Sequence, residues 1–345
     1  MAKILVVGGA GYVGGHLTDC LEEAGHEVTV YDLLLYEDIY LKPVRFVFGD
    51  ILDHEQLLPY VQDADIVIWL AALVGDGACS LDPELSHRIN AESVRWISSV
   101  HRGRLVFMST CSVYGAQDGM LTEESPLNPL SLYAETKLES EKILAEHPNA
   151  VVFRLGTLYG LGDKFSRLRV DLVVNTLTIR AAIGGHMSVF GGQQYRPLLH
   201  VRDVATAIML ALDSSVTGTF DITGENVTVL EMATAVQDQI PEALIDITDI
   251  PFQDARNYRV SGEKARTQLK FKPTLFMRDG IAEVKALVEE GRIRDLTAPR
   301  FSNYAALRPY LRDYQSPLGE EVYVAHQLTR HRRRILPSQL SHNPV

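Results

Sequence analysis

The chain has 345 residues, of which 46% are hydrophobic and 22% charged, and its formal net charge is −11. A chain of this length exceeds what one hydrophobic core normally organises, so we expect two lobes. The negative charge argues against nucleic-acid binding, because nucleic acids are themselves polyanions. No apolar run is long enough to span a membrane and the N-terminus lacks a signal-peptide pattern, so a cytoplasmic location is expected. The three cysteines, Cys20, Cys79 and Cys111, lack metal-ligand spacing, which predicts reduced thiols and no metal site.

Strands and helices alternate along the first 160 residues. Short β-branched runs predict strands at residues 3–9, 26–32, 44–50, 64–72, 103–110 and 149–156. Helical spacing of apolar residues predicts helices at 12–25, 53–62, 83–100 and 131–147. Strands that alternate with helices form a parallel sheet covered on both faces, so the sequence predicts an α/β fold with a Rossmann-type, doubly wound sheet. Ligands of such sheets bind beyond the carboxyl ends of the strands.

The periodicity weakens after residue 160. Residues 164–186 predict a helix between glycine-containing loops, and residues 196–212 a short strand and a helix that could return to the first lobe. We therefore assign residues 1–165, with part of 195–225, to the sheet lobe. Residues 166–345 are assigned mainly to a smaller C-terminal α/β lobe, with a tail from about residue 300 that contains a basic run at 329–334.

Three glycines, Gly8, Gly11 and Gly14, form a G-x-x-G-x-x-G pattern between the first predicted strand and its helix. Glycine permits a tight turn, a close approach of the backbone to a pyrophosphate, and close packing of the helix. The N-terminus of the helix supplies unpaired N–H groups and a positive dipole. The pattern in this position predicts a dinucleotide site.

Asp32 ends the second predicted strand, where a carboxylate can accept hydrogen bonds from both ribose hydroxyls of an adenosine. Three leucines follow it, and no arginine is present there to hold a 2′-phosphate. The sequence therefore favours NAD over NADP as the cofactor.

Tyr133 and Lys137 have Y-x-x-x-K spacing on the helix predicted at 131–147, so they share one helix face. A neighbouring ammonium lowers the pKa of a tyrosine, and we expect Tyr133 to be an acid/base group near neutral pH. The hydroxyl of Thr110 lies upstream, at the end of the strand predicted at 103–110.

In chain order these motifs resemble the extended short-chain dehydrogenase/reductases, and among them the nucleotide-sugar epimerase/dehydratase branch. The resemblance rests on GGAGYVGG (8–15), GD (49–50), LAA (70–72), STCSVYG (109–115), YAETK (133–137), RLGTLYG (154–160) and RPLLHVRDVA (196–205). It implies an NAD-binding first lobe and a second lobe that binds a nucleoside-diphosphate sugar. It also implies a homodimer that pairs through the helices predicted at 83–100 and 131–147.

The resemblance also implies roles for particular residues. Thr110 would hydrogen-bond the reacting sugar oxygen, Asp50 would approach the adenine, and Lys137 would hold the nicotinamide ribose. The other implied cofactor contacts are Tyr12, Val13, Ile51, Leu70, Ala71, Ala72 and Tyr133. The other implied substrate contacts are Ser112, Asn175, Arg196, His200 and Arg259, of which Arg259 fits a structural role equally well.

The chain departs from this branch after Thr110. Sugar-nucleotide 4,6-dehydratases carry an Asp-Glu pair there, and this chain has Cys111 and Ser112, which argues against that reaction. Cys111 is either a small buried residue at the strand end or a thiol acid/base that acts at C5 or C6. Thr157 stands where the family usually has asparagine.

The reaction that these residues predict is epimerisation at C4 of the sugar through a transient 4-keto intermediate, with the C4 hydride passing to NAD and back. The alternatives within the enzyme class are a dehydratase or a C3/C5 epimerase that uses Cys111, and a 4-keto-sugar reductase. The alternative outside that class is an NAD-sensing scaffold protein.

Overall fold

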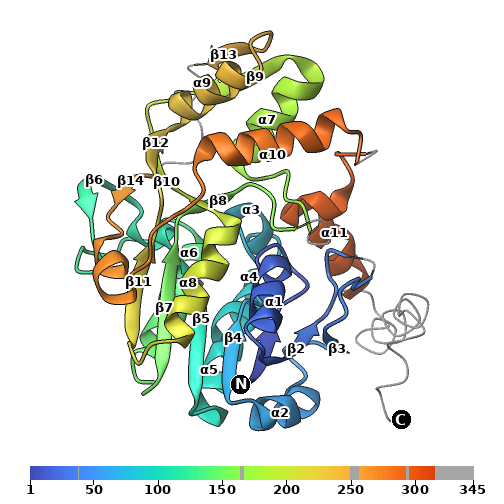
Figure 1. The fold of residues 1–345 in the computed structure, drawn as a ribbon, viewed down its shortest axis with the longest axis vertical. Coiled ribbons are helices and arrows are strands. Elements are labelled where there is room, and N and C mark those ends of the chain that lie inside the picture. Colours follow the sequence, from blue (N-terminus) through green and yellow to red (C-terminus); the bar gives the residue numbers. More distant parts are fainter. Residues whose placement is uncertain (38, 164–166, 249–255, 293–294, 315–345) are drawn as a thin grey trace.

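The structure is a computed structural model that describes residues 1–37, 39–163, 167–248, 256–292 and 295–314. Seven parallel strands form its central sheet in the order β3-β2-β1-β4-β5-β7-β11 (Figure 1). The strands are β1 (Lys3–Val7), β2 (Glu27–Asp32), β3 (Arg45–Phe48), β4 (Ile66–Trp69), β5 (Arg104–Thr110), β7 (Ala150–Leu155) and β11 (Gly218–Ile222). This arrangement confirms the predicted fold class.

Helices cover both faces of this sheet, which explains why apolar residues on both faces of its inner strands are buried. Ile4 and Val6 of β1 pack toward α1 (Gly14–Glu23) and α8 (Val201–Leu212). Leu5 and Val7 face the opposite way, toward α2 (His54–Asp63), α5 (Ser93–Val100) and α6 (Leu132–Leu144). The helix predicted at 83–100 consists of α4 (Pro83–His87), a π-helical turn (Arg88–Glu92) and α5. A short helix, α3 (Asp76–Cys79), follows β4.

A smaller lobe lies beyond the carboxyl ends of the central strands, at the top of Figure 1. Its helices are α7 (Val173–Gly184), α9 (Val229–Gln239) and α10 (Met277–Glu289), which share a buried apolar core with a two-stranded sheet of β9 (His186–Phe190) and β13 (Leu244–Thr248). A three-stranded sheet contains β8 (Thr157–Tyr159), β10 (Tyr195–His200) and β12 (Asn226–Thr228). A further pair contains β6 (Ala116–Leu121) and β14 (Asn257–Val260). Between β10 and β12 the chain forms α8, which packs on the central sheet, and β11, which is its edge strand.

Two shorter helical turns complete the secondary structure around β5 and α8. A 3₁₀ turn (Cys111–Tyr114) follows β5, and a π-helical turn (Ala265–Leu269) packs near α8 and β11.

The C-terminal part differs from its prediction as a tail from about residue 300. A 3₁₀ turn (Pro299–Phe301) leads into α11 (Asn303–Tyr314). The buried side chains of Leu307 and Leu311 pack against Leu73, Cys79 and Leu85 of the sheet lobe. The reason is the spacing of these leucines, which places both on one helix face. The basic run at 329–334 lies outside the described residues.

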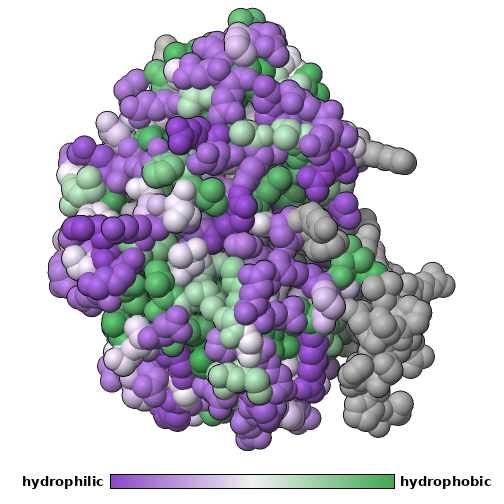
Figure 2. All heavy atoms as spheres, viewed as in Figure 1, coloured by the Kyte–Doolittle hydropathy of each residue, from purple (hydrophilic) through white to green (hydrophobic). Residues whose placement is uncertain are grey.

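Seen from the same side, hydrophilic residues cover most of the surface and hydrophobic residues form small groups between them (Figure 2). Among the described residues, no helix is both long enough and apolar enough to cross a bilayer.

Candidate active site

A cavity of about 680 Å³ lies at the carboxyl ends of the central strands. Its wall includes residues that follow β1, β2, β3, β4, β5 and β7, together with residues of the smaller lobe. Ligands of doubly wound sheets bind at this edge, because the loops that leave the strands converge there. The motifs that were far apart in the sequence therefore face one space.

The glycine loop forms one wall of the cavity through Gly8, Gly11, Tyr12 and Val13. Gly8 has a φ of +82°, and a Cβ at this position would lie 2.4 Å from the backbone nitrogen of Ala71. Only glycine fits there, so the loop after β1 and the segment after β4 can lie in direct contact. Gly14 does not line the cavity. A Cβ there would lie 2.1 Å from the carbonyl oxygen of Gly9, so Gly14 serves the close packing of α1 on the loop.

Asp32 stands at the carboxyl end of β2 and lines the same cavity. Its carboxylate accepts hydrogen bonds from the backbone nitrogens of Ala10, at 3.0 Å, and Leu34, at 2.7 Å. Burial raises the pKa of Asp32, and these two hydrogen bonds oppose that effect. The carboxylate is thereby fixed beside the glycine loop. Asp50, Ile51, Leu70, Ala71 and Ala72 complete this part of the wall. An acidic residue beside a glycine-rich loop fits the adenosine and diphosphate of a dinucleotide.

Thr110, Tyr133 and Lys137 line the cavity where β5 ends and α6 begins. Ser131 caps α6 by accepting a hydrogen bond from the backbone nitrogen of Ala134 at 3.3 Å, so the helix starts just before Tyr133. Lys137 is buried and donates to the carbonyl oxygen of Met108 at 2.8 Å. The three predicted catalytic groups therefore share one wall.

The electrostatics of this wall differ from the sequence-based expectation. Burial raises the pKa of Tyr133, and the nearby Cys79 acts in the same direction, while Arg169 and the Thr110 hydroxyl oppose them. Burial also lowers the pKa of Lys137 to about 8. The pKa of Tyr133 is therefore raised where a lowered value was expected, because burial is the largest influence on it.

Two of the predicted substrate residues, Ser112 and Arg196, also line the cavity. The hydroxyl of Ser112 lies 3.1 Å from a guanidinium nitrogen of Arg256, and Arg196 donates to the carbonyl oxygen of Arg256. Asp76 accepts from Ser131 at 2.6 Å and lies 3.6 Å from Arg256. Thr157 is part of the same wall.

Five predicted site residues do not line the cavity: Gly14, described above, and four others that have partners elsewhere. Cys111 is fully buried, donates to the carbonyl oxygen of Arg154 at 3.3 Å, and burial raises the pKa of its thiol well above the usual value. Asn175 is fully buried, accepts from the backbone nitrogen of Gly160 at 2.9 Å, and donates to the carbonyl oxygen of Arg169 at 2.9 Å.

The other two, His200 and Arg259, also have structural partners. His200 caps α8 by accepting from the backbone nitrogen of Arg202, and its other ring nitrogen lies 3.0 Å from Glu283. The guanidinium of Arg259 lies over the ring of Tyr195, 5.1 Å from its centroid. The buried thiol matches the structural alternative for Cys111, and the contacts of Arg259 match its structural alternative, while the substrate contacts expected of Asn175 and His200 remain predictions.

The sequence analysis missed several polar residues of the wall. They include Tyr36, Glu37, Asp76, Arg167, Arg169, Asp171, Thr176, Arg180, Gln194, Arg256 and Asn303. Asp76 follows the carboxyl end of β4, a position that the rule for such sheets would have indicated. Arg256 lies three positions before Arg259, which the sequence analysis named as a candidate. No local signal marks the others.

Comparison with known proteins gives a consistent result. The sequence model described as "NAD dependent epimerase/dehydratase family" matches residues 4–222. YtcB of Bacillus subtilis (strain 168), described as an uncharacterized UDP-glucose epimerase, is 28% identical over 307 residues, which cover 81% of this chain and 95% of YtcB. A dTDP-glucose 4,6-dehydratase of Streptomyces niveus is 30% identical over 325 residues, which cover 84% of this chain and 94% of that protein. The solved structure of MoeE5 in complex with UDP-glucuronic acid and NAD is 26% identical, has a TM-score of 0.72, and aligns with 84% of this chain and 99% of MoeE5.

The sheet, with a glycine loop and a Thr-Tyr-Lys set facing one cavity at its carboxyl edge, defines the class of Rossmann-fold enzymes that use a dinucleotide. Within that class the chain belongs to the NAD dependent epimerase/dehydratase family, and its cofactor is NAD. The predicted family and cofactor are confirmed.

Proposed function

We propose that the protein is an NAD-dependent epimerase of a nucleoside-diphosphate sugar, which acts at C4 through a transient 4-keto sugar. The observation that supports this most directly is the common wall of Thr110, Tyr133 and Lys137 in the cavity that the glycine loop also lines. A sugar hydroxyl placed at that wall lies within reach of a phenol, an aliphatic hydroxyl and an ammonium.

Each of these groups has one task in the proposal. Tyr133 accepts the proton of the C4 hydroxyl and later returns it, Thr110 hydrogen-bonds the same oxygen, and Lys137 holds a ribose hydroxyl. Bound NAD supplies the hydride acceptor and a positively charged ring, a charge of the kind that lowers the pKa of a neighbouring phenol. Arg169 acts on the Tyr133 pKa in the same direction.

The positions after Thr110 argue against dehydration. Removal of water across C5 and C6 needs a base and an acid beside the sugar. Cys111 is directed into a core with Val113, Tyr114 and Tyr258, and burial keeps its thiol protonated. Ser112 has no titratable group near neutral pH. Asp76 is an acidic alternative in the same wall, since its charge acts on the pKa of Tyr133, but its oxygens are engaged by Ser131 and Arg256.

The experiment is turnover in heavy water with UDP- and dTDP-linked hexoses and hexuronic acids, followed by NMR of the product. Epimerisation at C4 returns the same hydride to the sugar, so we expect no deuterium on product carbons and near-native activity for Cys111→Ala. Deuterium at C3 or C5, together with an inactive Cys111→Ala variant, would overturn the proposal and assign catalysis to the thiol. Net consumption of NADH would indicate a reductase instead.

A further inference from the structure

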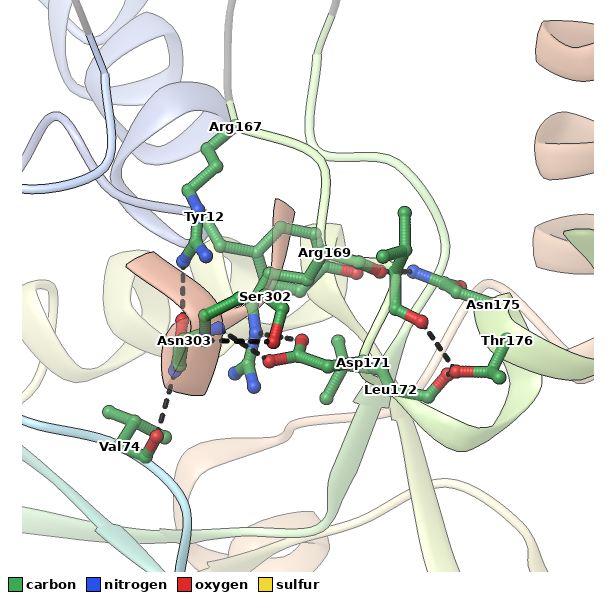
Figure 3. Close-up of polar contacts among 12 residues, drawn as sticks. Tyr12, Val74, Arg167, Arg169, Asp171, Leu172, Asn175, Thr176, Ser302 and Asn303 are labelled. Carbon is green, nitrogen blue, oxygen red and sulfur yellow. Dashed lines mark hydrogen bonds and ion pairs between the residues drawn. The ribbon is translucent and has the colours of Figure 1, made fainter. Parts of the chain in front are cut away.

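Arg167 is a buried cation in the wall of the cavity, with 3% of its surface exposed. Its guanidinium donates to the side-chain oxygen of Asn303 at 2.6 Å (Figure 3). It also donates to the carbonyl oxygen of Arg300 at 2.7 Å. The remaining nitrogen, Nη2, is buried and has no hydrogen-bond partner among the described residues. A buried guanidinium that leaves one donor unused indicates a ligand that accepts hydrogen bonds there.

The carboxylates near Arg167 are engaged by other arginines. Asp171 is paired with Arg169 at 2.9 Å and accepts from the backbone nitrogen of Asn303 at 2.8 Å. Glu37 lies 4.0 Å from Arg300. The acceptors that Arg167 itself reaches are a carbonyl and an amide oxygen, and burial lowers its pKa to about 10. The charge of Arg167 is thus incompletely compensated within the protein, which favours an anion.

A second polar group in the same part of the wall lacks a partner. The guanidinium of Arg167 lies over the ring of Tyr36, 3.8 Å from its centroid. The hydroxyl of Tyr36 is buried without a hydrogen-bond partner among the described residues, and Tyr36 also lines the cavity. Together the two residues offer unused donors on one side of the cavity.

The sheet order places Arg167 relative to the glycine loop. Tyr36 belongs to the segment after β2, and Asn303 donates to the carbonyl oxygen of Val74, in the segment after β4, at 2.8 Å. Since β1 lies between β2 and β4 in the sheet, the glycine loop after β1 lies between these two attachment points. Arg167 therefore contacts Tyr36 on one side of the glycine loop and, on the other side, Asn303, which is bound to Val74.

We propose that Arg167 completes the diphosphate site of the dinucleotide from the side opposite the glycine loop, and that Asn303 of the C-terminal segment is its positioning residue. The glycine loop offers backbone donors to one side of the diphosphate, and Arg167 with Tyr36 offers side-chain donors to the other. The diphosphate of the nucleotide sugar has the same chemistry, so the test separates the two sources. The assignment rests on NAD dependence and is independent of which carbon of the sugar reacts.

The first test measures binding by titration calorimetry for Arg167→Gln with NAD, ADP, adenosine and UDP. Loss of a charged donor weakens binding by about 10- to 100-fold, so we expect that loss for NAD and ADP and no change for adenosine or UDP. Arg104→Gln is the matched control, because Arg104 is a half-buried arginine that donates to a carbonyl oxygen away from the cavity. Unchanged NAD affinity, or weakened UDP binding with NAD unaffected, would overturn the assignment. An equal loss for adenosine would do the same, since adenosine has no diphosphate.

The second test uses two substitutions of Asn303. Asn303→Ala removes the acceptor that orients Arg167, whereas Asn303→Asp keeps an acceptor but brings a negative charge into an anion site. We expect titration calorimetry to show that NAD binds more weakly to Asn303→Asp than to Asn303→Ala. A purely structural role predicts the reverse order, because the aspartate is closer in shape to asparagine. That order would disprove the positioning role.

Discussion

Tyr133 holds its proton at the wall of a cavity where burial opposes ionisation. Thr110 and Arg169 favour the phenolate, so the acid/base function depends on the groups around the phenol more than on the tyrosine itself. Lys137, with a pKa lowered to about 8, remains mostly charged at neutral pH.

Replacing Tyr133 with phenylalanine tests this function at a single residue. Tyr133→Phe removes the proton acceptor and leaves the cavity wall in place, so activity is expected to fall by roughly 10²- to 10⁴-fold. NAD binding should stay near native, which calorimetry can check in parallel. Thr110→Ala is the milder comparison, because it removes a hydrogen bond and no proton acceptor. Near-native turnover by Tyr133→Phe would exclude this residue as the base.

The residues that could be predicted from the sequence are those whose chemistry follows from local spacing. The predicted strands and helices are enough to place the motifs of Gly8, Asp32, Tyr133 and Lys137 at the carboxyl edge of the sheet, where the cavity lies. The side chain of Cys111 could not be placed, because the chain turns there from strand to 3₁₀ helix and the sequence does not fix which way the thiol points. Asn303 carries no local signal at all, since its position depends on packing between segments far apart in the chain.

At the scale of elements, the seven central strands and the long helices follow from apolar patterns, because each is stabilised by burial of its own faces. The short strands of the smaller sheets do not. β6 pairs with β14 across a long sequence separation, and neither has a strong period of its own. α11 is recognisable once Leu307 and Leu311 are seen to be buried, although residues 300–345 show weak periodicity as a whole.

The N-terminus of α8 makes stability depend on pH. His200 is fully buried, and burial, followed by the charge of Arg202, lowers its pKa to about 4, while Glu283 beside it is paired with Arg202. Between pH 6.5 and 4 the unfolded chain therefore binds a proton that the folded chain does not, so stability falls as the pH falls through this window. The full loss is about 3 kcal/mol for a shift of this size.

We expect His200→Gln to flatten this dependence in urea unfolding measured at pH 7 and pH 5. Glutamine can retain both an acceptor for the cap and a donor to Glu283, and it does not titrate. His186→Gln is the control, because His186 is exposed and should leave the pH dependence unchanged. An identical slope for His200→Gln and the native protein would refute the assignment.

At the scale of the whole molecule, α5 and α6 pack together on one side of the sheet and present charged residues outward. Glu139 lies 2.9 Å from Arg95 on the neighbouring helix and 2.9 Å from His87. The resemblance to extended short-chain dehydrogenase/reductases implies that these helices pair with those of a second copy. In an isologous pair, each side chain occurs twice in the interface.

We therefore expect light scattering to give the mass of a homodimer at micromolar concentration. Glu139→Lys removes the carboxylate that pairs with Arg95 and places a second positive charge beside it in both copies, so it should shift the mass toward that of the monomer. Glu263→Lys, on an exposed position away from these helices, should leave the mass unchanged. A native monomer under these conditions would contradict the prediction.

The hydrogen bond between Asn303 and Val74 joins positions 229 residues apart, and that between Asn303 and Arg167 joins positions 136 apart. A ribosome releases the glycine loop and the sheet strands long before it releases α11, and contacts of such separation form late in folding because they close the longest loops. The growing chain can thus complete the sheet while the site for the cofactor's diphosphate still lacks its oriented arginine. On the proposed role of Arg167, a chain that ends before α11 should therefore bind NAD more weakly than the full chain.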